Sequence, residues 1–362
     1  MIYVLLGTKA QLIKMAPVIM ELRDRGLEYK FISTGQHKET TDDILANFQI
    51  PGPEMVLHQG RDIVSIRQML AWGIKVVARA FRSRQALFPK NNGLVLVHGD
   101  TASTLLGALI AKLAGQKVGH VEAGLRSYNY FHPFPEELIR IAVGRLADIR
   151  FCPGQWAVQN VSGYRLGRNI NIGANTLQDS LRIILSRHSS LDLPIPDEEF
   201  GVVSIHRFEN IKDKRSLLRI VELIELIAGQ FSLLFILHKP TERKLRQFGL
   251  FDRLSALPGV EFRHRYDYLR FMRLVMAAKF VVSDGGSNQE ECFYLDKPLL
   301  LLRAATERQE GLGKNCVLSE YAPVKVKEFM ESLRERQPTM PNKLLGSPSA
   351  RIVDVCEEYC VG

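Results

Sequence analysis

The chain has few cysteines and lacks long apolar runs. Its cysteines form no Cys-x-x-Cys pair and no zinc-binding spacing, and an odd number of them makes a poor disulfide framework. They are Cys152, Cys292, Cys316, Cys356 and Cys360. This pattern predicts a protein of the reducing cytoplasm with no metal site. Because no apolar run is long enough to cross a bilayer, the sequence also predicts no membrane span.

Two other features are missing from the sequence. The first residues, Met1–Gly7, have no basic leader and are too short for a signal peptide, so they predict a β-strand. Basic residues interleaved with aromatic ones are absent, which argues against nucleic acid as a partner despite a net charge of +9. The densest basic group, Lys75–Lys90, is interpreted as a solvated helix, with attraction to an anionic nucleotide or a membrane surface as the alternative.

The sequence that remains is typical of a globular α/β protein. Its 362 residues are long enough for two domains, and 46% are hydrophobic. Short apolar runs alternate with amphipathic stretches, as in βαβ units with a parallel sheet. The strands predicted in the first half are Ile2–Leu6, Tyr29–Ser33, Leu94–Val97, Lys117–Val121 and Ile149–Cys152. The helices predicted there are Lys9–Asp24, Glu39–Phe48, Ile63–Phe88 and Thr101–Leu113.

The second half repeats this alternation. Its predicted strands are Ile170–Ile172, Gly201–Ser204, Ser232–Leu237, Val260–Phe262, Phe280–Val282 and Leu299–Leu302. Its predicted helices are Lys214–Leu226, Thr241–Gln247, Tyr268–Ala278, Asn288–Tyr294 and Pro323–Glu335. We therefore expect two doubly wound domains, residues 1–165 and 166–345, facing each other across a cleft where ligands bind. Residues 346–362 are predicted to form a C-terminal helix, for which packing back on the first domain is one possibility.

Three segments of the first half each place a carboxylate at the end of an apolar run or the start of a helix. Asp100 follows the run that ends in His98, and Glu122 follows the run that ends in Val121. Glu136 comes directly after a proline, which favours the first turn of a helix. If parallel strands bring these side chains to one rim, they predict proton transfer at an unactivated carbon. Helix capping is the simpler interpretation of Glu136.

The second half contains a strand, a Gly285-Gly286 turn and a helix start. Backbone N–H groups at such a turn suit a phosphate, and Glu291, one turn into the helix, is a candidate partner for ribose hydroxyls. An ordinary tight turn is the alternative. His206 follows a strand and is a candidate active-site residue. Several cations also lie at strand ends and are candidate phosphate ligands: Lys9, Lys14, Arg126 and Arg308.

Together these blocks resemble the non-hydrolysing UDP-N-acetylglucosamine 2-epimerases. The resemblance runs from Gly7 to Glu310. Its most specific blocks are Lys14-Met15-Ala16-Pro17, His98-Gly99-Asp100-Thr101, His120-Val121-Glu122-Ala123-Gly124-Leu125-Arg126, Pro135-Glu136-Glu137, Ser283 to Glu291, and Thr306-Glu307-Arg308. Hydrolysing relatives usually lack Glu-Ala-Gly-Leu-Arg at this position, which favours the non-hydrolysing branch.

The resemblance implies two Rossmann-like domains in the GT-B architecture and a cytoplasmic homodimer. It implies inversion of carbon 2 of UDP-N-acetylglucosamine through elimination and re-addition of UDP, without a cofactor and usually for surface polysaccharide synthesis. It carries Asp100, Glu122 and Glu136 over as acid/base carboxylates and His206 as an active-site histidine near the diphosphate. It also implies that Arg140 orients Glu136. The remaining substrate contacts that we expect are Lys9, Lys14, Arg140, Gly285, Gly286, Ser287, Glu291 and Arg308.

The chain departs from the family pattern in three places. Gly7-Thr8-Lys9-Ala10-Gln11 stands where the family usually has Gly-Thr-Arg-Pro-Glu, so a lysine replaces an arginine fork. Asp284-Gly285-Gly286-Ser287 replaces Asp-Ser-Gly-Gly, which moves a serine. His238-Lys239-Pro240-Thr241 replaces His-x-Asn-Pro. In bacterial members this last region, with Gln36-His37 and Arg67-Gln68, helps form a second, activating UDP-sugar site, so we expect altered regulation.

Four other functions stay open at this point. A hydrolysing 2-epimerase would release N-acetylmannosamine and UDP, and a related epimerase would act on another UDP-N-acetyl sugar. A GT-B glycosyltransferase would need an acceptor groove and no set of three carboxylates. A catalytically silent nucleotide-sugar binding module is disfavoured by the retention of all three carboxylates with His206.

Overall fold

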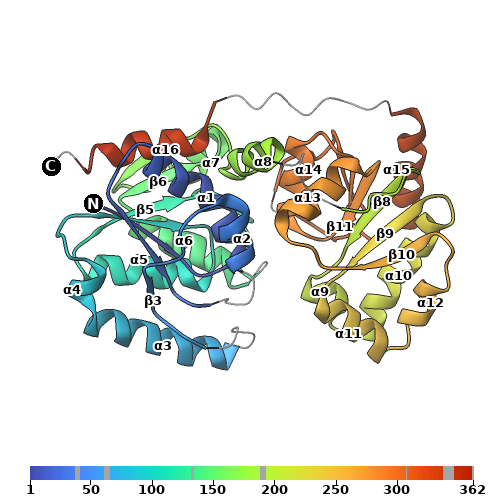
Figure 1. Ribbon diagram of the computed structural model, residues 1–362, viewed down its shortest axis with the longest axis horizontal. Coiled ribbons are helices and arrows are strands. Elements are labelled where there is room, and N and C mark those ends of the chain that lie inside the picture. Colours follow the sequence, from blue (N-terminus) through green and yellow to red (C-terminus); the bar gives the residue numbers. More distant parts are fainter. Residues whose placement is uncertain are drawn as a thin grey trace. The chain divides into compact units, whose positions relative to one another are not determined.

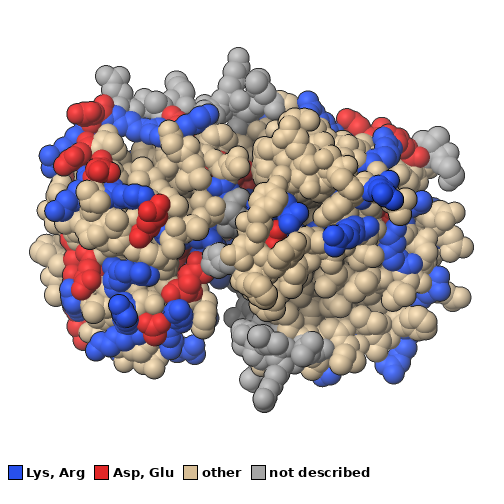
Figure 2. Space-filling model, turned by 180° about the vertical axis from the view of Figure 1, so that it is seen from behind, with Lys and Arg blue, Asp and Glu red and all other residues tan. Residues whose placement is uncertain are grey.

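Two compact units make up the computed structural model of the protein. Unit 1 contains Met1–Leu185 and Leu345–Gly362, and unit 2 contains Ser186–Leu344. The structure describes residues 1–36, 41–60, 66–131, 134–187, 193–306, 308–336 and 346–360. Within these ranges, none of the helices combines the length and the apolar character that crossing a membrane requires. On the face shown in Figure 2, Lys and Arg side chains are interspersed with Asp and Glu rather than gathered into one continuous patch.

Unit 1 is built on a seven-stranded parallel sheet with the order β3-β2-β1-β4-β5-β6-β7. Its strands are β1 (Ile2–Leu6), β2 (Tyr29–Ser33), β3 (Met55–Val56), β4 (Leu94–His98), β5 (Lys117–Val121), β6 (Ile149–Cys152) and β7 (Arg168–Asn171). Its helices are α1 (Lys9–Asp24), α2 (Thr41–Phe48), α3 (Ile66–Arg82), α4 (Arg84–Leu87), α5 (Ala102–Leu113), α6 (Glu136–Leu146), α7 (Gln155–Val161), α8 (Leu177–Ser186) and α16 (Pro348–Glu357). Helix α1 contacts α2 and α16, and α5 contacts α3 and α6, as expected for helices on the two faces of a doubly wound sheet (Figure 1).

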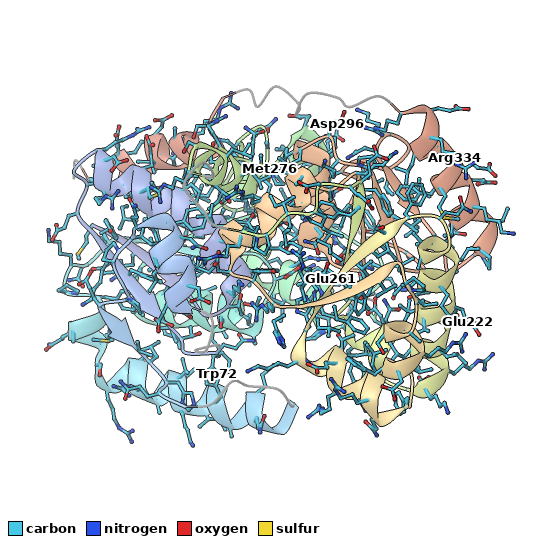
Figure 3. All side chains as sticks on the ribbon, turned by 45° about the vertical axis from the view of Figure 1, so that its right-hand side comes forward. Trp72, Glu222, Glu261, Met276, Asp296 and Arg334 are labelled. Carbon is cyan, nitrogen blue, oxygen red and sulfur yellow. The ribbon has the colours of Figure 1, made fainter. Side chains whose placement is uncertain are left out.

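The apolar alternation of the sequence produces the core of unit 1. Strands β1 and β4 are buried along their whole length, as strands covered on both faces must be. One core cluster joins Leu5 and Val97 of these strands to Val76 of α3 and Ala108 of α5. Trp72, labelled in Figure 3, is also buried, and its indole nitrogen donates to the backbone oxygen of Thr34 at 3.2 Å.

Unit 2 repeats the design with a six-stranded parallel sheet of order β10-β9-β8-β11-β12-β13. Its strands are β8 (Phe200–Ser204), β9 (Ser232–Leu237), β10 (Val260–His264), β11 (Phe280–Ser283), β12 (Leu299–Leu301) and β13 (Cys316–Leu318). Its helices are α9 (Phe208–Ile211), α10 (Lys214–Ala228), α11 (Lys239–Gln247), α12 (Phe251–Ser255), α13 (Tyr268–Ala277), α14 (Gly286–Tyr294) and α15 (Pro323–Glu335). Within unit 2, as in unit 1, the strand order reverses beside the first strand, which is the Rossmann arrangement.

Three features of the chain's organisation differ from the sequence prediction. Residues Ile170–Ile172 were assigned to the second domain, but β7 pairs with β6 and completes the first sheet. The two units divide after Leu185, later in the chain than residue 165, because β7 and nearly all of α8 belong to unit 1. The helix predicted over Ile63–Phe88 is interrupted at Ser83, which separates α3 from α4.

The C-terminal helix belongs to unit 1. Helix α16 contacts α1, and Arg25, at the end of α1, forms ion pairs with Asp354 at 2.7 Å and with Glu357 at 3.0 Å. At the other end of α16, the Asp179 carboxylate accepts hydrogen bonds from the Ser347 hydroxyl and the Ser349 backbone. The last part of the sequence is thus held against residues far from it along the chain.

Candidate active site

The reversal of strand order in unit 1 lies between β1 and β4. In doubly wound sheets this is where the crevice opens and where ligands bind, at the carboxyl ends of the strands. The β1–α1 turn holds Gly7 and Thr8, and the β4–α5 turn holds Gly99 and Asp100. Lys9 begins α1 at this edge and is half-buried. The fold therefore puts Lys9 and Asp100, two of the predicted site residues, at the expected edge of the sheet.

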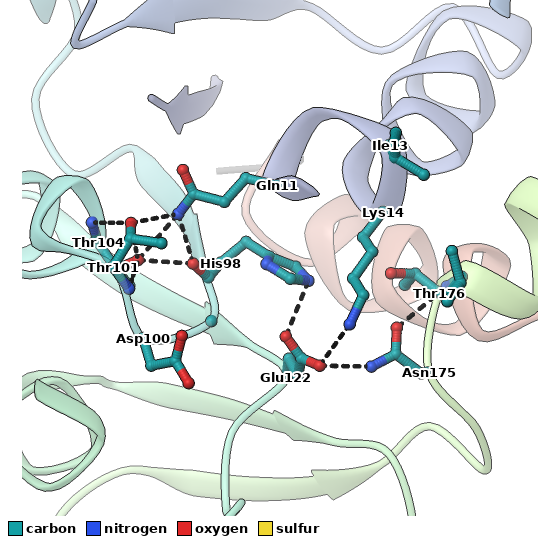
Figure 4. A network of polar contacts seen from close by, with 12 residues as sticks. Gln11, Ile13, Lys14, His98, Asp100, Thr101, Thr104, Glu122, Asn175 and Thr176 are labelled. Atoms are coloured by element: carbon teal, nitrogen blue, oxygen red, sulfur yellow. Dashed lines mark hydrogen bonds and ion pairs between the residues drawn. The ribbon is translucent and has the colours of Figure 1, made fainter. Parts of the chain in front are cut away.

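Gln11 connects these two turns. Its side-chain oxygen accepts the backbone N–H groups of Gly7 at 2.9 Å and Thr8 at 3.1 Å. Its amide nitrogen donates to the backbone oxygen of His98 at 2.6 Å and to the Thr104 hydroxyl at 2.9 Å (Figure 4). A carboxylate has no hydrogens to donate, so only the amide satisfies both turns. Gln11 therefore ties the β1–α1 turn to the β4–α5 turn.

Glu122 lies directly after β5 in a cluster of buried polar groups. Its Oε1 atom accepts hydrogen bonds from Lys14 Nζ at 2.6 Å and from Asn175 Nδ2 at 2.8 Å (Figure 4). The Nε2 atom of His98 lies 3.5 Å from Oε2. The Glu122 backbone has a φ of 65°, a left-handed conformation that is unfavourable for a residue other than glycine. Such local strain clusters at functional sites, and here it goes with a carboxylate held by two donors.

Asp100 belongs to a second cluster that includes α6. The Arg140 guanidinium contacts Asp100 Oδ2 through Nη2 at 2.6 Å and through Nε at 2.8 Å. Arg140 Nη1 also lies 3.4 Å from the carboxylate of Glu137, which is fully buried. The Glu137 carboxylate also accepts hydrogen bonds from Arg126 Nε at 2.6 Å and from the Ser127 backbone at 3.0 Å. The sequence had placed Arg140 beside Glu136, whereas the carboxylates that it contacts here are those of Asp100 and Glu137.

Glu136 occupies the first position of α6 and is half-buried. One of its oxygens, Oε2, is buried and makes no hydrogen bond to the described residues. A buried carboxylate oxygen without a hydrogen-bond donor has lost its hydration at a cost in free energy. A ligand that donates a hydrogen bond to it would offset this cost. The first turn of α6 therefore presents Glu136, while Glu137 is fixed inside the protein.

The pKa values of His120 and Glu137 are both shifted. Burial lowers the pKa of His120 to about 4, so the ring is neutral at physiological pH. Its Nε2 atom lies 2.8 Å from the backbone oxygen of Gly99 and donates to it in the neutral ring. Burial by itself would raise the pKa of Glu137, but the Ser127 and Arg126 hydrogen bonds and the charge of Arg140 hold it below the usual value. Unit 1 thus keeps a neutral histidine and an ionised carboxylate behind its candidate site.

In unit 2 the strand order reverses between β8 and β11. Asp284, after β11, is fully buried and accepts the backbone N–H groups of His206 at 3.1 Å and Arg207 at 3.0 Å. It also accepts from the Asn210 amide at 3.0 Å. The ring of His206 stacks on that of His238 with centroids 4.7 Å apart, and its side chain stays 40% exposed. Asp284 therefore fixes the loop that presents His206 at the carboxyl edge of the second sheet.

The Gly285-Gly286 turn opens α14 as predicted. Gly285 caps the helix without a side-chain hydrogen bond, and Ser287 is half-buried in the first turn. A Cβ atom on Gly286 would lie 3.0 Å from Arg308 Nε, so the arginine lies close to the start of the helix. Arg308 also pairs with the buried Glu290 at 2.7 Å. A helix start beside an arginine is a favourable place for a phosphate group.

Glu291 lies in the same helix, with 3% of its surface exposed. It accepts a hydrogen bond from Asn288 Nδ2 at 2.8 Å. Burial raises the pKa of Tyr268, and the neighbouring Glu291 carboxylate raises it further. Among the described residues, no three His, Cys, Asp or Glu side chains group as a metal site.

Comparison with known families identifies the family of the chain. Residues 20–356 match the family model for UDP-N-acetylglucosamine 2-epimerases. The chain belongs to this family. It is 30% identical over 331 residues to the UDP-N-acetylglucosamine 2-epimerase of Methanocaldococcus jannaschii, and the match covers 88% of each chain. It is 32% identical over 318 residues to the Bacillus subtilis UDP-N-acetylglucosamine 2-epimerase, covering 84% of this chain and 79% of that one.

Solved structures of the epimerase family have the same fold. The M. jannaschii 2-epimerase in complex with UDP-GlcNAc and UDP superposes with a TM-score of 0.83 at 26% identity, covering 99% of both chains. The Neisseria meningitidis 2-epimerase bound to UDP-GlcNAc has a TM-score of 0.84 at 27% identity, again covering 99% of both chains. An E. coli heptosyltransferase shares the fold alone, with a TM-score of 0.50 at 16% identity over 92% of this chain and 99% of that one. The predicted α/β fold, with two Rossmann-like domains in a GT-B-like architecture, is therefore confirmed.

Sequence reasoning missed four residues that organise the site in this epimerase family member. They are Gln11, Glu137, Asn175 and Asp284. Glu137 was recognised only as part of a helix start, and Asp284 only as part of a turn. Asn175 precedes α8 in a segment that sequence analysis left without a role. Three predicted positions, His37, the side chain of Arg67 and Glu307, lie outside the described residues.

Proposed function

We propose that this chain is a non-hydrolysing UDP-N-acetylglucosamine 2-epimerase that interconverts UDP-N-acetylglucosamine and UDP-N-acetylmannosamine. Family membership supports the 2-epimerase activity, and the Glu122-Ala123-Gly124-Leu125-Arg126 block favours the non-hydrolysing branch. In unit 1 both ends of this block form ion pairs, because Glu122 contacts Lys14 and Arg126 contacts the buried Glu137. The observation that carries the proposal is this pair of linked clusters around Glu122 and Asp100.

The chemistry requires removal of a proton that no neighbouring carbonyl acidifies. In the elimination, a carboxylate takes the proton from carbon 2, and the electrons of that C–H bond form the double bond between carbons 1 and 2. The bond between carbon 1 and the phosphate oxygen breaks, and UDP leaves with the electron pair. For re-addition, an acid returns a proton to the other face of carbon 2, and UDP attacks carbon 1. Neither step changes the oxidation state overall, so no cofactor is needed.

We assign the proton transfers to Asp100, Glu122 and Glu136. Asp100 and Glu122 follow adjacent strands, β4 and β5, which pair in register from Leu94 to His98. Each is held by a buried cation, Arg140 for Asp100 and Lys14 for Glu122. Proton transfer depends on such fixed geometry, because a displacement of about 1 Å can cost about a hundredfold in rate.

We assign the UDP moiety to the residues of unit 2. The N–H groups at the start of α14, with Gly285, Gly286 and Ser287, suit the diphosphate, and Arg308 adds a positive charge. His206, presented by Asp284, is the candidate side chain near the departing phosphate. In unit 1, Lys9 at the start of α1 stays an expected substrate contact. We also propose Glu291 as a ribose contact. Its side chain is buried and accepts a hydrogen bond from Asn288, so Asn288 would lie beside it at the ribose.

One experiment tests the proposal directly. The protein is incubated with UDP-N-acetylglucosamine in deuterated water, and the sugars are followed by proton NMR and mass spectrometry. Deuterium at carbon 2 of both UDP-sugars, with UDP still attached, is the expected result. Free N-acetylmannosamine with UDP would instead show a hydrolysing enzyme. Absence of exchange at carbon 2 would contradict the 2-epimerase activity on this sugar, and a panel of other UDP-N-acetyl sugars would then identify the substrate.

We also keep the homodimer as part of the proposal. Unit 1 has an apolar groove between α3 and α5, and Arg82 is the charged residue among its lining side chains. Large apolar side chains stay exposed around it, including Ile74 at 72% and Phe81 at 70%. Apolar surface of this kind marks interaction sites, and a two-fold axis would place the same patch of each copy against the other. Sedimentation velocity of the full chain measures whether it dimerises.

A further inference from the structure

Asn175 links the start of α8 to the candidate catalytic carboxylate. Its side chain is 3% exposed. Its Oδ1 atom accepts the backbone N–H of Leu177 at 3.0 Å, an Asx turn, and its Nδ2 atom donates to Glu122 Oε1 at 2.8 Å. A backbone N–H can only donate and a carboxylate can only accept, so the two neighbours fix which end of the amide faces which. The turn therefore aims a hydrogen-bond donor at Glu122.

The Glu122 side chain is positioned by groups from several elements. Lys14 of α1 binds the same oxygen as Asn175, and His98 of β4 lies beside the other oxygen. His120, in β5 just before Glu122, is neutral, and the charges of Glu122 and Asp100 both act on it. Lys14 alone would pull Glu122 toward α1, since a flexible ammonium fixes distance better than direction. Asn175 supplies a second, rigid contact on the side of α8.

We propose that Asn175 is a positioning residue that holds the Glu122 carboxylate in its reactive orientation and ionised form. This inference rests on the proposed function, because it concerns proton transfer by Glu122. It also makes a claim that is independent of activity, namely that the Asn175 amide and the Glu122 carboxylate are directly coupled. Hydrogen bonds to the charged form of a carboxylate favour that form, and a charge-assisted bond is about twice as strong as a neutral one.

Asn175→Asp is the decisive variant. Aspartate makes the same Asx turn, so the start of α8 is preserved. It replaces the donor with an oxygen that faces Glu122, and two carboxylates so close together share a proton. We expect the acidic limb of the kcat profile to move up by about one pH unit or more, and kcat at neutral pH to fall about tenfold or more. KM is expected to stay within about twofold, because Asn175 is not assigned to UDP binding.

Asn171→Asp is the matched control. Asn171 accepts the backbone N–H of Gly173 at 2.8 Å in the same kind of turn, but it is exposed, and its amide nitrogen lies 3.4 Å from Gln155. The same added charge here should leave the pH profile of kcat unchanged. A second readout is the carboxyl ¹³C resonance of Glu122, assigned by its loss in Glu122→Gln. Its titration midpoint should rise in Asn175→Asp and not in Asn171→Asp.

The outcomes separate the two claims. A wild-type protein without carbon 2 exchange would contradict the proposed function, and the ¹³C titration would still test the coupling of Asn175 to Glu122. If the wild type is active and Asn175→Asp has the wild-type pH profile and Glu122 midpoint, the positioning role is wrong and Asn175 serves only the turn. A shift of similar size in both aspartate variants would also overturn it.

Discussion

The two units have the same strand order but use their acidic side chains in opposite ways. In unit 1, Asp100 and Glu122 stand at strand ends, each beside a buried cation, and the Glu122 backbone is in a left-handed conformation. In unit 2, Asp284 and Glu290 are fully buried, and their contacts hold the His206 loop and Arg308. Under the proposed function, the same fold therefore presents acids for proton transfer in one unit and N–H groups and cations for an anion in the other.

The turn between strand and helix is the part of the strand–turn–helix unit that differs between the two units. A glycine turn with an uncapped helix start leaves N–H groups available, as after β11. A turn closed by capping boxes and cross-turn hydrogen bonds, as with Thr8 and Thr101, uses those groups internally. The carboxylate beside such a closed turn faces fewer competing donors. Variants of the unit 1 carboxylates should therefore change kcat, and variants at the start of α14 in unit 2 should change KM.

The largest effect is expected from the unit 1 carboxylates. Replacing Asp100 with Asn, Glu122 with Gln or Glu136 with Gln should lower kcat for carbon 2 exchange by about a hundredfold to ten-thousandfold, the usual contribution of a general acid or base. Each amide keeps the shape of the side chain but cannot transfer the proton. UDP binding, measured by isothermal titration calorimetry, should stay within about threefold of the wild type. Normal exchange in all three variants would refute the assignment.

A smaller effect, on the pH dependence of stability, is expected from His120, the buried histidine of unit 1. Because the folded pKa of His120 is about 4, the unfolded chain binds a proton that the folded chain does not as the pH falls below about 6.5. The free energy of unfolding should therefore decrease from about pH 6.5 to about pH 4, by about 2 kcal/mol at pH 5.

His120→Gln is the test of this pH dependence. Glutamine keeps a donor for the Gly99 oxygen and does not titrate, so this part of the acid loss should vanish. Urea unfolding of both proteins at about pH 7.5 and pH 5 measures the difference. An equal loss in wild type and variant would show that His120 is protonated in the folded state.

A still smaller effect, on KM rather than kcat, is expected from Gly286→Ala. The new methyl group would lie 3.0 Å from Arg308 Nε and push the guanidinium away from the helix start. We expect KM for the UDP-sugar to rise about threefold to tenfold with kcat little changed, because a binding contact is weakened. Gly229→Ala, where a methyl group has contacts of 3.7 Å, is the control in the same unit. A fall in kcat without a change in KM would contradict the assignment of UDP binding to this part of unit 2.

The smallest effect concerns the C-terminal helix. Arg25→Ala removes the ion pairs with Asp354 and Glu357, which are partly exposed and worth about 0.2–1 kcal/mol each. Hydrogen exchange of α16 should speed up several-fold while kcat and KM stay at wild-type values. Arg253→Ala, which breaks an ion pair with Glu225 in unit 2, should leave the exchange of α16 unchanged. Unchanged protection in Arg25→Ala would mean that the Asp179 hydrogen bonds and apolar packing hold α16 without these ion pairs.

Much of the fold could be predicted because its determinants are local. Strands β1, β2, β5 and β6 have the predicted bounds, and so does α1, whose apolar period and Thr8 cap lie within one short segment. The short strands β3 and β13 were missed, since two or three residues give no periodicity. The boundary between the units was misplaced because the sequence predicts a strand near residue 170 but not the sheet that it joins, and β7 pairs with β6.

The sequence by itself determined the alternating α/β order, the segments that carry the carboxylates and the glycine turn, and membership of an epimerase family. Periodicity, capping and turn chemistry act between neighbours along the chain, so they can be recognised without coordinates. Only the tertiary structure decided which partners those side chains take. Arg140 contacts Asp100 from 40 positions away, and Asn175 reaches Glu122 from 53 positions away. Such contacts depend on strand register and helix packing, which no local pattern encodes.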